Sequence, residues 1–468
     1  MHRCSSIERP SGNTMTASTH RTPEEVDDRP NVVVVGGGFG GVSCVRALRR
    51  AKANVVLVDR MNHTLFQPLL YQLATGVLDD SAIASPLRQV FARQSNVSVL
   101  RASVDGFDVD RRCVLAGELE IPWDHLVLAA GMKTSYFGND QWEAMAPGLK
   151  TLDDAHRVRG RILEAFEQAE YVRVWGETDE VRPWLTFVVV GGGATGVEVA
   201  GAIKQLAVDR LAPEFKDLDV AGCRVLLVEG GDRLLAAMST KSSAAAAKTL
   251  RSYGVEIHLE TRVVDVSPEG VTIEQGGSRE FVPARTVVWG AGVTGNGLGA
   301  RLAEAVGLET DRGGRLEVSG DLTIAGRDDI RVIGDLARVP IGDAGATVPG
   351  VAQGAIQMGT YAGRAIAARV AGRTPAKKPF RYFDKGSLAT VGRGKAVLDM
   401  GRLHLAGFTG WLVWAAVHIA FLVNFRSRIA AMGSWAFAYV FQTGVNELIT
   451  KPAAPRDPVE PGSGASSK

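Results

Sequence analysis

Three glycines near the start of the chain could bring the backbone against a diphosphate group. Gly36, Gly38 and Gly41 have G-x-G-x-x-G spacing and follow four consecutive valines, which are typical of a strand buried on both faces. In such a turn the first glycine permits the bend, the second allows close approach to a pyrophosphate, and the third lets the next helix pack on the strand. The N–H groups at the start of that helix favour an anion. The sequence therefore predicts a dinucleotide-binding turn.

An acidic residue completes this arrangement. A second predicted strand runs from Asn54 to Asp59. A carboxylate about 20 residues after the glycines can accept hydrogen bonds from the hydroxyls of an adenosine ribose. Strand, turn, helix and acid thus agree on a ligand site rather than a glycine-rich turn without a ligand.

The same pattern occurs a second time. Gly191, Gly193 and Gly196 follow another apolar strand, and the strand after the next helix ends in Glu229. Two complete fingerprints imply two dinucleotides, or one dinucleotide and a relic of a nucleotide site. Because the carboxylate of Glu229 would repel a 2′-phosphate, the second site favours NADH over NADPH.

Further strands suggest how the chain is divided. Two apolar strands, at 123–131 and 286–293, end in small residues that let a ligand approach the backbone, and each closes one fingerprint domain. A short strand at 330–337 ends in Gly-Asp, so the chain is expected to return to the first domain at about residue 295. The predicted divisions are a disordered tail at 1–30, the first domain at 31–150 and 295–373, an inserted second domain at 151–294, a C-terminal membrane-anchoring region at 374–445 and a disordered tail at 446–468.

Composition narrows the possible functions. The formal charge of the 468 residues is +2, which gives no basic footprint for a nucleic acid. The four cysteines, Cys4, Cys44, Cys113 and Cys223, have none of the spacings of a metal site, a disulfide framework or a redox dithiol. No apolar core marks the first 30 residues as a secretory signal.

The C-terminal region differs from the rest. Residues 405–425 are apolar over about 21 positions, which is long enough to span a bilayer. Arg426 and Arg428 follow, and then a shorter apolar run at 429–441. Either both segments lie in the membrane interface with the arginines toward head groups, or the first inserts deeply. A buried core helix or a dimer interface is the alternative.

At this point a resemblance to a known family is visible. Residues 352–357 match the A-Q-x-A-x-Q pattern of the quinone site in type II NADH:quinone oxidoreductases. The segments at 66–70 and 383–389 and the apolar C-terminus also resemble that family, its actinobacterial members in particular. The resemblance runs from about Val32 to Phe441. It implies an α/β chain with two Rossmann-like dinucleotide-binding domains, the two-dinucleotide-binding flavoprotein fold, plus C-terminal membrane-associated helices.

The resemblance also implies cofactors and their contacts. FAD would bind without a covalent bond in the first domain, and NADH would bind as substrate in the second. The residues implied for FAD are Gly36, Gly38, Phe39, Gly40, Gly41, Asp59, Arg60, Val104, Ala130, Gly131, Asp335, Ala352, Gln353 and Lys385. The residues implied for NADH are Gly191, Gly193, Gly196, Glu229, Ala291 and Gly292.

Three residues are expected to carry the quinone chemistry. Gln353 and Gln357 are four residues apart and share one helix face, so their amides can donate to quinone oxygens. In relatives the glutamate that matches Glu198 is implicated in quinone reduction. The alternative role of Glu198 is to complement the dipole of its helix, and the glutamines can equally be flavin-facing or surface groups.

The resemblance further implies a non-proton-pumping enzyme on the cytoplasmic face of the cell membrane. Its expected partners are NADH, a membrane quinone with menaquinone as the first choice, the bilayer surface and a second copy of the chain. A ferredoxin or rubredoxin reductase is one alternative, but its members are soluble and have no need of residues 405–441. A sulfide:quinone oxidoreductase needs a cysteine pair that is missing here. A flavin-based redox sensor remains a third alternative.

Overall fold

The computed structural model describes residues 28–341, 345–373, 378–440 and 447–449. Outside these ranges lie most of the two tails expected to be disordered. Also outside are residues 374–377 of the predicted membrane-anchoring region and the end of the last apolar run. The chain divides into two compact units. Unit 1 comprises residues up to 64, 85–133 and 293–385, and unit 2 comprises 65–84, 134–292 and 386 onward.

Unit 1 is built on a six-stranded sheet with the order β20-β21-β9-β1-β2-β5. Its strands are β1 (Asn31–Val35), β2 (Asn54–Asp59), β5 (Val97–Arg101), β9 (His125–Leu128), β20 (Thr323–Ile324) and β21 (Arg327–Val332). All neighbours are parallel except β20 and β21. The valines of β1 have almost no exposed surface, as a run without polar alternation predicts.

Two helices of unit 1 pack backbone to backbone. They are α1 (Phe39–Ala47), which follows the first glycine turn, and α10 (Ala352–Val370). A Cβ on Gly359 would lie 2.1 Å from the carbonyl oxygen of Gly40, and one on Gly363 would lie 2.5 Å from that of Cys44. Small residues on α10 therefore permit this contact. The remaining elements of unit 1 include β6 (Gly106–Asp108), β7 (Cys113–Ala116), β8 (Leu119–Pro122) and α9 (Gly297–Ala305).

Unit 2 contains a four-stranded parallel sheet with the order β13-β12-β11-β17. Its strands are β11 (Thr186–Val190), β12 (Arg224–Val228), β13 (Val255–His258) and β17 (Thr286–Trp289). An antiparallel sheet joins β14 (Thr261–Val266), β15 (Gly270–Gln275) and β16 (Ser278–Pro283). The helices are α2 (Leu70–Ala74), α5 (Leu152–Val174), α6 (Thr178–Trp184), α7 (Ala194–Gln205) and α8 (Thr240–Ser252), and α7 continues as a π-helical segment, η3 (Leu206–Leu211).

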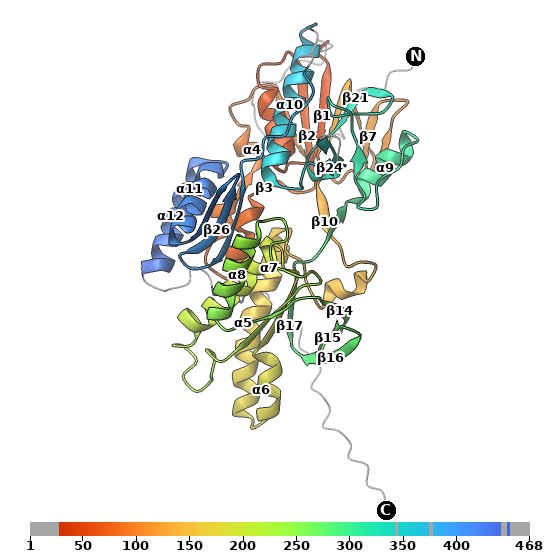
Figure 1. The fold of residues 1–468 in the computed structure, drawn as a ribbon. Helices are drawn as coiled ribbons and strands as arrows, with labels where there is room; N and C mark the ends of the chain where they lie inside the picture. The colour runs from red at the N-terminus through yellow and green to blue at the C-terminus, as the bar shows by residue number, and fades with distance from the viewer. Residues whose placement is uncertain (1–27, 342–344, 374–377, 441–446, 450–468) are drawn as a thin grey trace, which may run out of the picture. The chain divides into compact units, whose positions relative to one another are not determined.

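The C-terminal part of the chain belongs to unit 2 instead of forming a region of its own. It begins with three antiparallel strands, β25 (Ser387–Gly392), β26 (Lys395–Met400) and β27 (Leu403–Gly407). Helix α11 (Phe408–Phe421) lies against β26, and α12 (Phe425–Val440) follows (Figure 1). Lys385 lies just before this sheet, because Gly386 has a φ of +93° that interrupts extended backbone and β25 starts at Ser387.

The apolar run at 405–425 is not one helix. Its first residues pair with β26 as part of β27, and Gly407, at φ +77°, turns the chain into α11. The helix ends at Phe421. Asn424 then accepts a hydrogen bond from the N–H of Ser427 at 2.8 Å, which caps the start of α12. Within the described ranges, no helix combines the length and apolar character needed to cross a membrane.

Candidate functional site

The first glycine turn, in unit 1, has an open face. Gly36 has a φ of +109°, and a Cβ there would lie 2.3 Å from the carbonyl oxygen of Ala129. A Cβ on Gly41 would lie 1.8 Å from the carbonyl oxygen of Gly36. Gly38, in contrast, is exposed, and a Cβ on it would meet no atom within 4 Å. The turn is therefore closed where it packs and open where a phosphate would approach, which fits a dinucleotide.

The carboxylate of Asp59 holds this turn. One of its oxygens accepts a hydrogen bond from the N–H of Gly37 at 2.5 Å, and the other accepts from the N–H of Met61 at 2.7 Å. Asp59 ends β2, so the sheet places the acid beside the turn, where the sequence predicts the ribose contact.

All the residues implied for FAD belong to unit 1. Asn296, which sequence reasoning missed, contacts one of these residues. Its amide nitrogen donates to the carbonyl oxygen of Ala130 at 2.6 Å, and its amide oxygen caps the start of α9 by accepting from Leu298 at 3.1 Å. This asparagine fixes the Ala130-Gly131 turn, where the flavin contact is expected. An asparagine before a helical run is a recognisable helix cap. Its contact with Ala130, 166 residues away, could not be predicted from the neighbouring sequence.

Gln353 and Gln357 both contact the segment before β25. The amide of Gln357 donates to the carbonyl oxygen of Phe383 and accepts from its N–H, each at 2.9 Å. The amide oxygen of Gln353 accepts from the N–H of Lys385 at 2.9 Å. The shared helix face is thus observed, and both side chains hold residues 383–385. An amide nitrogen carries two hydrogens, so Gln357 retains the capacity for a further hydrogen bond.

The second glycine turn, in unit 2, repeats the first. Gly191 has a φ of +106°, and a Cβ on Gly196 would lie 1.8 Å from the carbonyl oxygen of Gly191. A Cβ on Gly193 would again meet nothing within 4 Å. The carboxylate of Glu229 accepts hydrogen bonds from the N–H groups of Gly192 and, at 2.6 Å, of Gly231. This turn also fits a dinucleotide.

An aromatic ring covers part of the second site. A Cβ on Gly292 would lie 2.5 Å from the ring of Phe137, so this ring packs directly on the Gly292 backbone. Phe137 is 68% exposed and has a φ of +53°, which is unusual for a bulky residue. Gly292 and Ala291 are the residues expected to lie under NADH. Phe137 was not singled out from the sequence, because nothing local marks a lone phenylalanine as a ligand neighbour.

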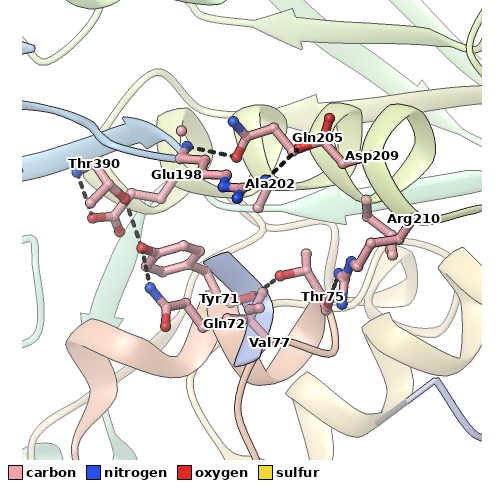
Figure 2. Close-up of a pocket in the computed structure, with 14 residues that line it drawn as sticks. Tyr71, Gln72, Thr75, Val77, Glu198, Ala202, Gln205, Asp209, Arg210 and Thr390 are labelled. Carbon is pink, nitrogen blue, oxygen red and sulfur yellow. Dashed lines mark hydrogen bonds and ion pairs between the residues drawn. The ribbon is translucent and has the colours of Figure 1, made fainter. Parts of the chain in front are cut away.

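Glu198 lies at a pocket within unit 2 (Figure 2). It projects from the first turns of α7 and is buried, and one of its carboxylate oxygens accepts from the N–H of Thr390 at 3.3 Å. Burial raises the pKa of Glu198 to about 8, and the Thr390 hydrogen bond opposes this only in part. The side chain therefore holds its proton at neutral pH, which favours a proton-donor role over simple complementation of the helix dipole.

A chain of hydrogen bonds connects the neighbour of Glu198 to α12. The hydroxyls of Thr390 and Tyr71 are 2.7 Å apart, and the amide nitrogen of Gln72 donates to the Tyr71 oxygen at 2.8 Å. The indole N–H of Trp435 donates to the amide oxygen of Gln72 at 2.6 Å. Tyr71, Gln72, Thr390 and Trp435 are all buried, and none was predicted from the sequence.

The described cysteines are not placed for thiol chemistry. Cys44, Cys113 and Cys223 are buried and make no disulfide. Burial raises the pKa of Cys44 to about 12 and that of Cys223 to about 11, so neither forms a thiolate at neutral pH. Within the described ranges, no cluster of histidine, cysteine and acidic side chains could hold a metal ion.

Comparison with known proteins decides the family. The pyridine nucleotide-disulphide oxidoreductase family matches residues 30–359. A type II NADH:quinone oxidoreductase from Mycobacterium tuberculosis is 43% identical over 418 residues, which cover 88% of each chain. The chain belongs to the type II NADH:quinone oxidoreductases. A Haemophilus influenzae type II NADH:quinone oxidoreductase is 31% identical and covers 77% of this chain and 85% of its own.

Solved structures agree on the fold of this type II enzyme. NDH2 from Plasmodium falciparum, solved in complex with NADH, has a TM-score of 0.80 at 19% identity and covers 90% of this chain and 100% of its own. A ferredoxin reductase from Rhodopseudomonas palustris has a TM-score of 0.60 and covers 80% of this chain and 83% of its own. The α/β dinucleotide-binding flavoprotein fold expected from the sequence is confirmed.

Proposed function

We propose that this enzyme uses FAD to oxidise NADH and to reduce a membrane quinone, with the two glycine turns as the two dinucleotide sites. The observation that carries this proposal is the pair of glycine turns, one in each unit. Both turns have the same backbone conformation and an open face at the second glycine, and in each a carboxylate accepts a hydrogen bond from the turn. Membership of the type II NADH:quinone oxidoreductases supplies the reaction.

Bound FAD would supply the redox chemistry of the reaction, between a hydride donor, NADH, and a two-electron acceptor, the quinone. In unit 1, the open N–H groups of the turn at Gly38 would hold the diphosphate and Asp59 the ribose. Asn296 would keep the Ala130-Gly131 backbone in place through its 2.6 Å hydrogen bond. Lys385 would offset negative charge on the reduced cofactor.

In unit 2, the turn at Gly193 would hold the diphosphate of NADH. Glu229 would accept a hydrogen bond from the ribose and repel a 2′-phosphate, which gives the preference for NADH.

Gln353 and Gln357 would line the quinone site and donate to the oxygens of the quinone, while they also hold residues 383–385. Glu198, which is protonated at neutral pH, would supply a proton to the reduced quinone.

We extend the proposal to the location of the enzyme. Helices α11 and α12 present large apolar side chains to the surface, among them Phe408 at 61% exposure and Phe425 at 76%. Such a surface suits the headgroup boundary of a bilayer, where a lipid-soluble quinone is found. We place the enzyme on the cytoplasmic face as a homodimer and take menaquinone as its quinone, in keeping with the actinobacterial resemblance.

An anaerobic two-step assay tests the function. NADH should bleach the flavin absorbance near 450 nm where NADPH does not, and a soluble quinone should then restore it. Bleaching without reoxidation by quinone would favour a ferredoxin-type reductase or a redox sensor. A purified protein without flavin would contradict the whole proposal.

Flotation with lipid vesicles tests the location. The Phe425→Ser variant should bind vesicles about 30-fold less tightly than the native protein, because burying this ring is worth about 2 kcal/mol. The matched control is Phe281→Ser, which removes a half-exposed ring from β16. Equal binding by both variants would show that α12 does not contact the lipid.

A further inference from the structure

The helix that carries Glu198 has a polar face along the pocket. Glu198, Ala202, Gln205 and Asp209 follow one another at intervals of four, three and four residues, which places them on one side of α7 and η3. All four line the pocket (Figure 2). Three of them are polar or acidic, and the fourth is too small to fill the space between Glu198 and Gln205.

The pocket gives this face access to solvent. About 70 Å³ of the pocket can be occupied by the centres of water molecules, which is room for several waters. Glu198 is 8% exposed at the buried end, whereas the side chain of Asp209 is 35% exposed at the other. The polar face therefore leads from the surface to a buried carboxyl.

Two arginines line the pocket beside Asp209, one in contact with its carboxylate and the other next to it in η3. Arg393, in the turn after β25, pairs with Asp209 at 3.9 Å, and its N–H donates to the amide oxygen of Gln205 at 2.8 Å. Arg210 of η3 pairs with Glu447 at 3.1 Å. Around Glu198 itself, α2 presents the Tyr71 hydroxyl and β25 presents Thr390. The lining residue from α12 is Ala438, which cannot ionise.

We propose that this pocket is the proton-uptake route of the enzyme, in which water along the face from Asp209 past Gln205 and Ala202 recharges Glu198 after each turnover. This inference rests on the proposed function. NADH, one proton and a quinone give NAD⁺ and a quinol, so each turnover takes one proton from solvent. The O–H bond of Glu198 breaks when its proton leaves. It forms again when a water molecule in the pocket gives a proton to the carboxylate and is itself reprotonated from bulk solvent.

The variant Ala202→Leu tests the route by filling the pocket. The matched control is Val208→Leu, an enlargement at an exposed position of η3 that does not line the pocket. In stopped-flow experiments on the full-length protein with bound flavin, reduction by NADH should be unchanged in both variants. Reoxidation by a soluble quinone should be at least about tenfold slower in Ala202→Leu alone.

Two further readouts separate a proton route from a packing defect. Formic acid, a small proton carrier, should restore reoxidation in Ala202→Leu. In Asp209→Asn, which preserves shape, reoxidation should be slow in dilute buffer and recover as the buffer concentration rises. This variant keeps the test available if Ala202→Leu does not fold.

Each remaining outcome overturns one proposal. Native-like reoxidation in both Ala202→Leu and Asp209→Asn would refute the proton route. A raised KM for quinone in Ala202→Leu, with kcat unchanged, would show that the pocket holds the quinone itself. If native protein with bound flavin is reduced by NADH but not reoxidised by quinone, the proposed function fails instead.

Discussion

The two glycine turns have the same backbone conformation but different surroundings. Gly36 and Gly191 have φ values of +109° and +106°, and the third glycine of each turn leaves no room for a methyl group. At the closing strand, a Cβ on Gly131 would meet nothing within 4 Å, whereas Gly292 lies under the ring of Phe137. Two residues after the third glycine stands Ser43 in one helix and buried Glu198 in the other. The glycine fingerprint determines the shape of each dinucleotide-binding turn, and residues outside the fingerprint determine what each site can do.

The largest expected effects come from the third glycines. Gly41→Ala and Gly196→Ala each force a methyl group against a carbonyl oxygen, which should cost about 3 kcal/mol of stability. Gly41→Ala should lose FAD, while Gly196→Ala should keep FAD and lose bleaching by NADH. Flavin content and anaerobic bleaching measure the two effects. The opposite pattern would show that FAD binds at the second turn and NADH at the first.

The burial of Glu198 should make stability depend on pH. Its pKa is raised from the ordinary 4.5 to about 8, so between these values the folded protein holds a proton there that the unfolded chain releases. This contribution to stability is complete below the unfolded pKa and is lost as pH rises through about 8, at about 1.4 kcal/mol per pH unit between the two pKa values. The Glu198→Gln variant does not titrate at this position. Thermal unfolding should show it gaining stability over the native protein as pH rises, and a constant difference would contradict the raised pKa.

The two acids should separate pyridine specificity from flavin binding. Glu229→Gln removes the charge that repels a 2′-phosphate, so the preference for NADH over NADPH in kcat/KM should fall about tenfold. Asp59→Asn should weaken FAD binding and leave that preference unchanged. A changed preference in Asp59→Asn would mean that NADH uses the first turn.

The smallest effect is expected at Phe137. Phe137→Ala uncovers Gly292, so the KM for NADH should fall by about threefold if the ring has to move before the cofactor can stack, a cost of well under 1 kcal/mol. Phe281→Ala, which removes a half-exposed ring from β16 of unit 2, is the control. A higher KM in Phe137→Ala would show that the ring stacks on NADH.

Local sequence patterns predicted the two dinucleotide-binding turns, whereas most of the other site residues depend on partners far away in the sequence and could not be predicted. The glycines, the buried strands and the acids are close in sequence, so spacing alone located them. Asn296, Tyr71 and Thr390 acquire their roles from partners that are more than 160 residues away. The break in the C-terminal apolar run has a different, local origin, because Leu405 lies in a hairpin strand and pairs with Leu398 before the helix starts. Apolar character alone does not separate an edge strand from a helix.

The division of unit 1 into separate stretches of chain sets an order for its folding during synthesis. Leu126 of β9 pairs with Ile330 of β21, and α1 packs on α10, which ends at Val370. A nascent chain therefore cannot complete this sheet until most of the protein has left the ribosome. The four parallel strands of unit 2 all lie between Thr186 and Trp289 and can pair earlier. FAD would then be captured late, and truncated chains would emerge without flavin.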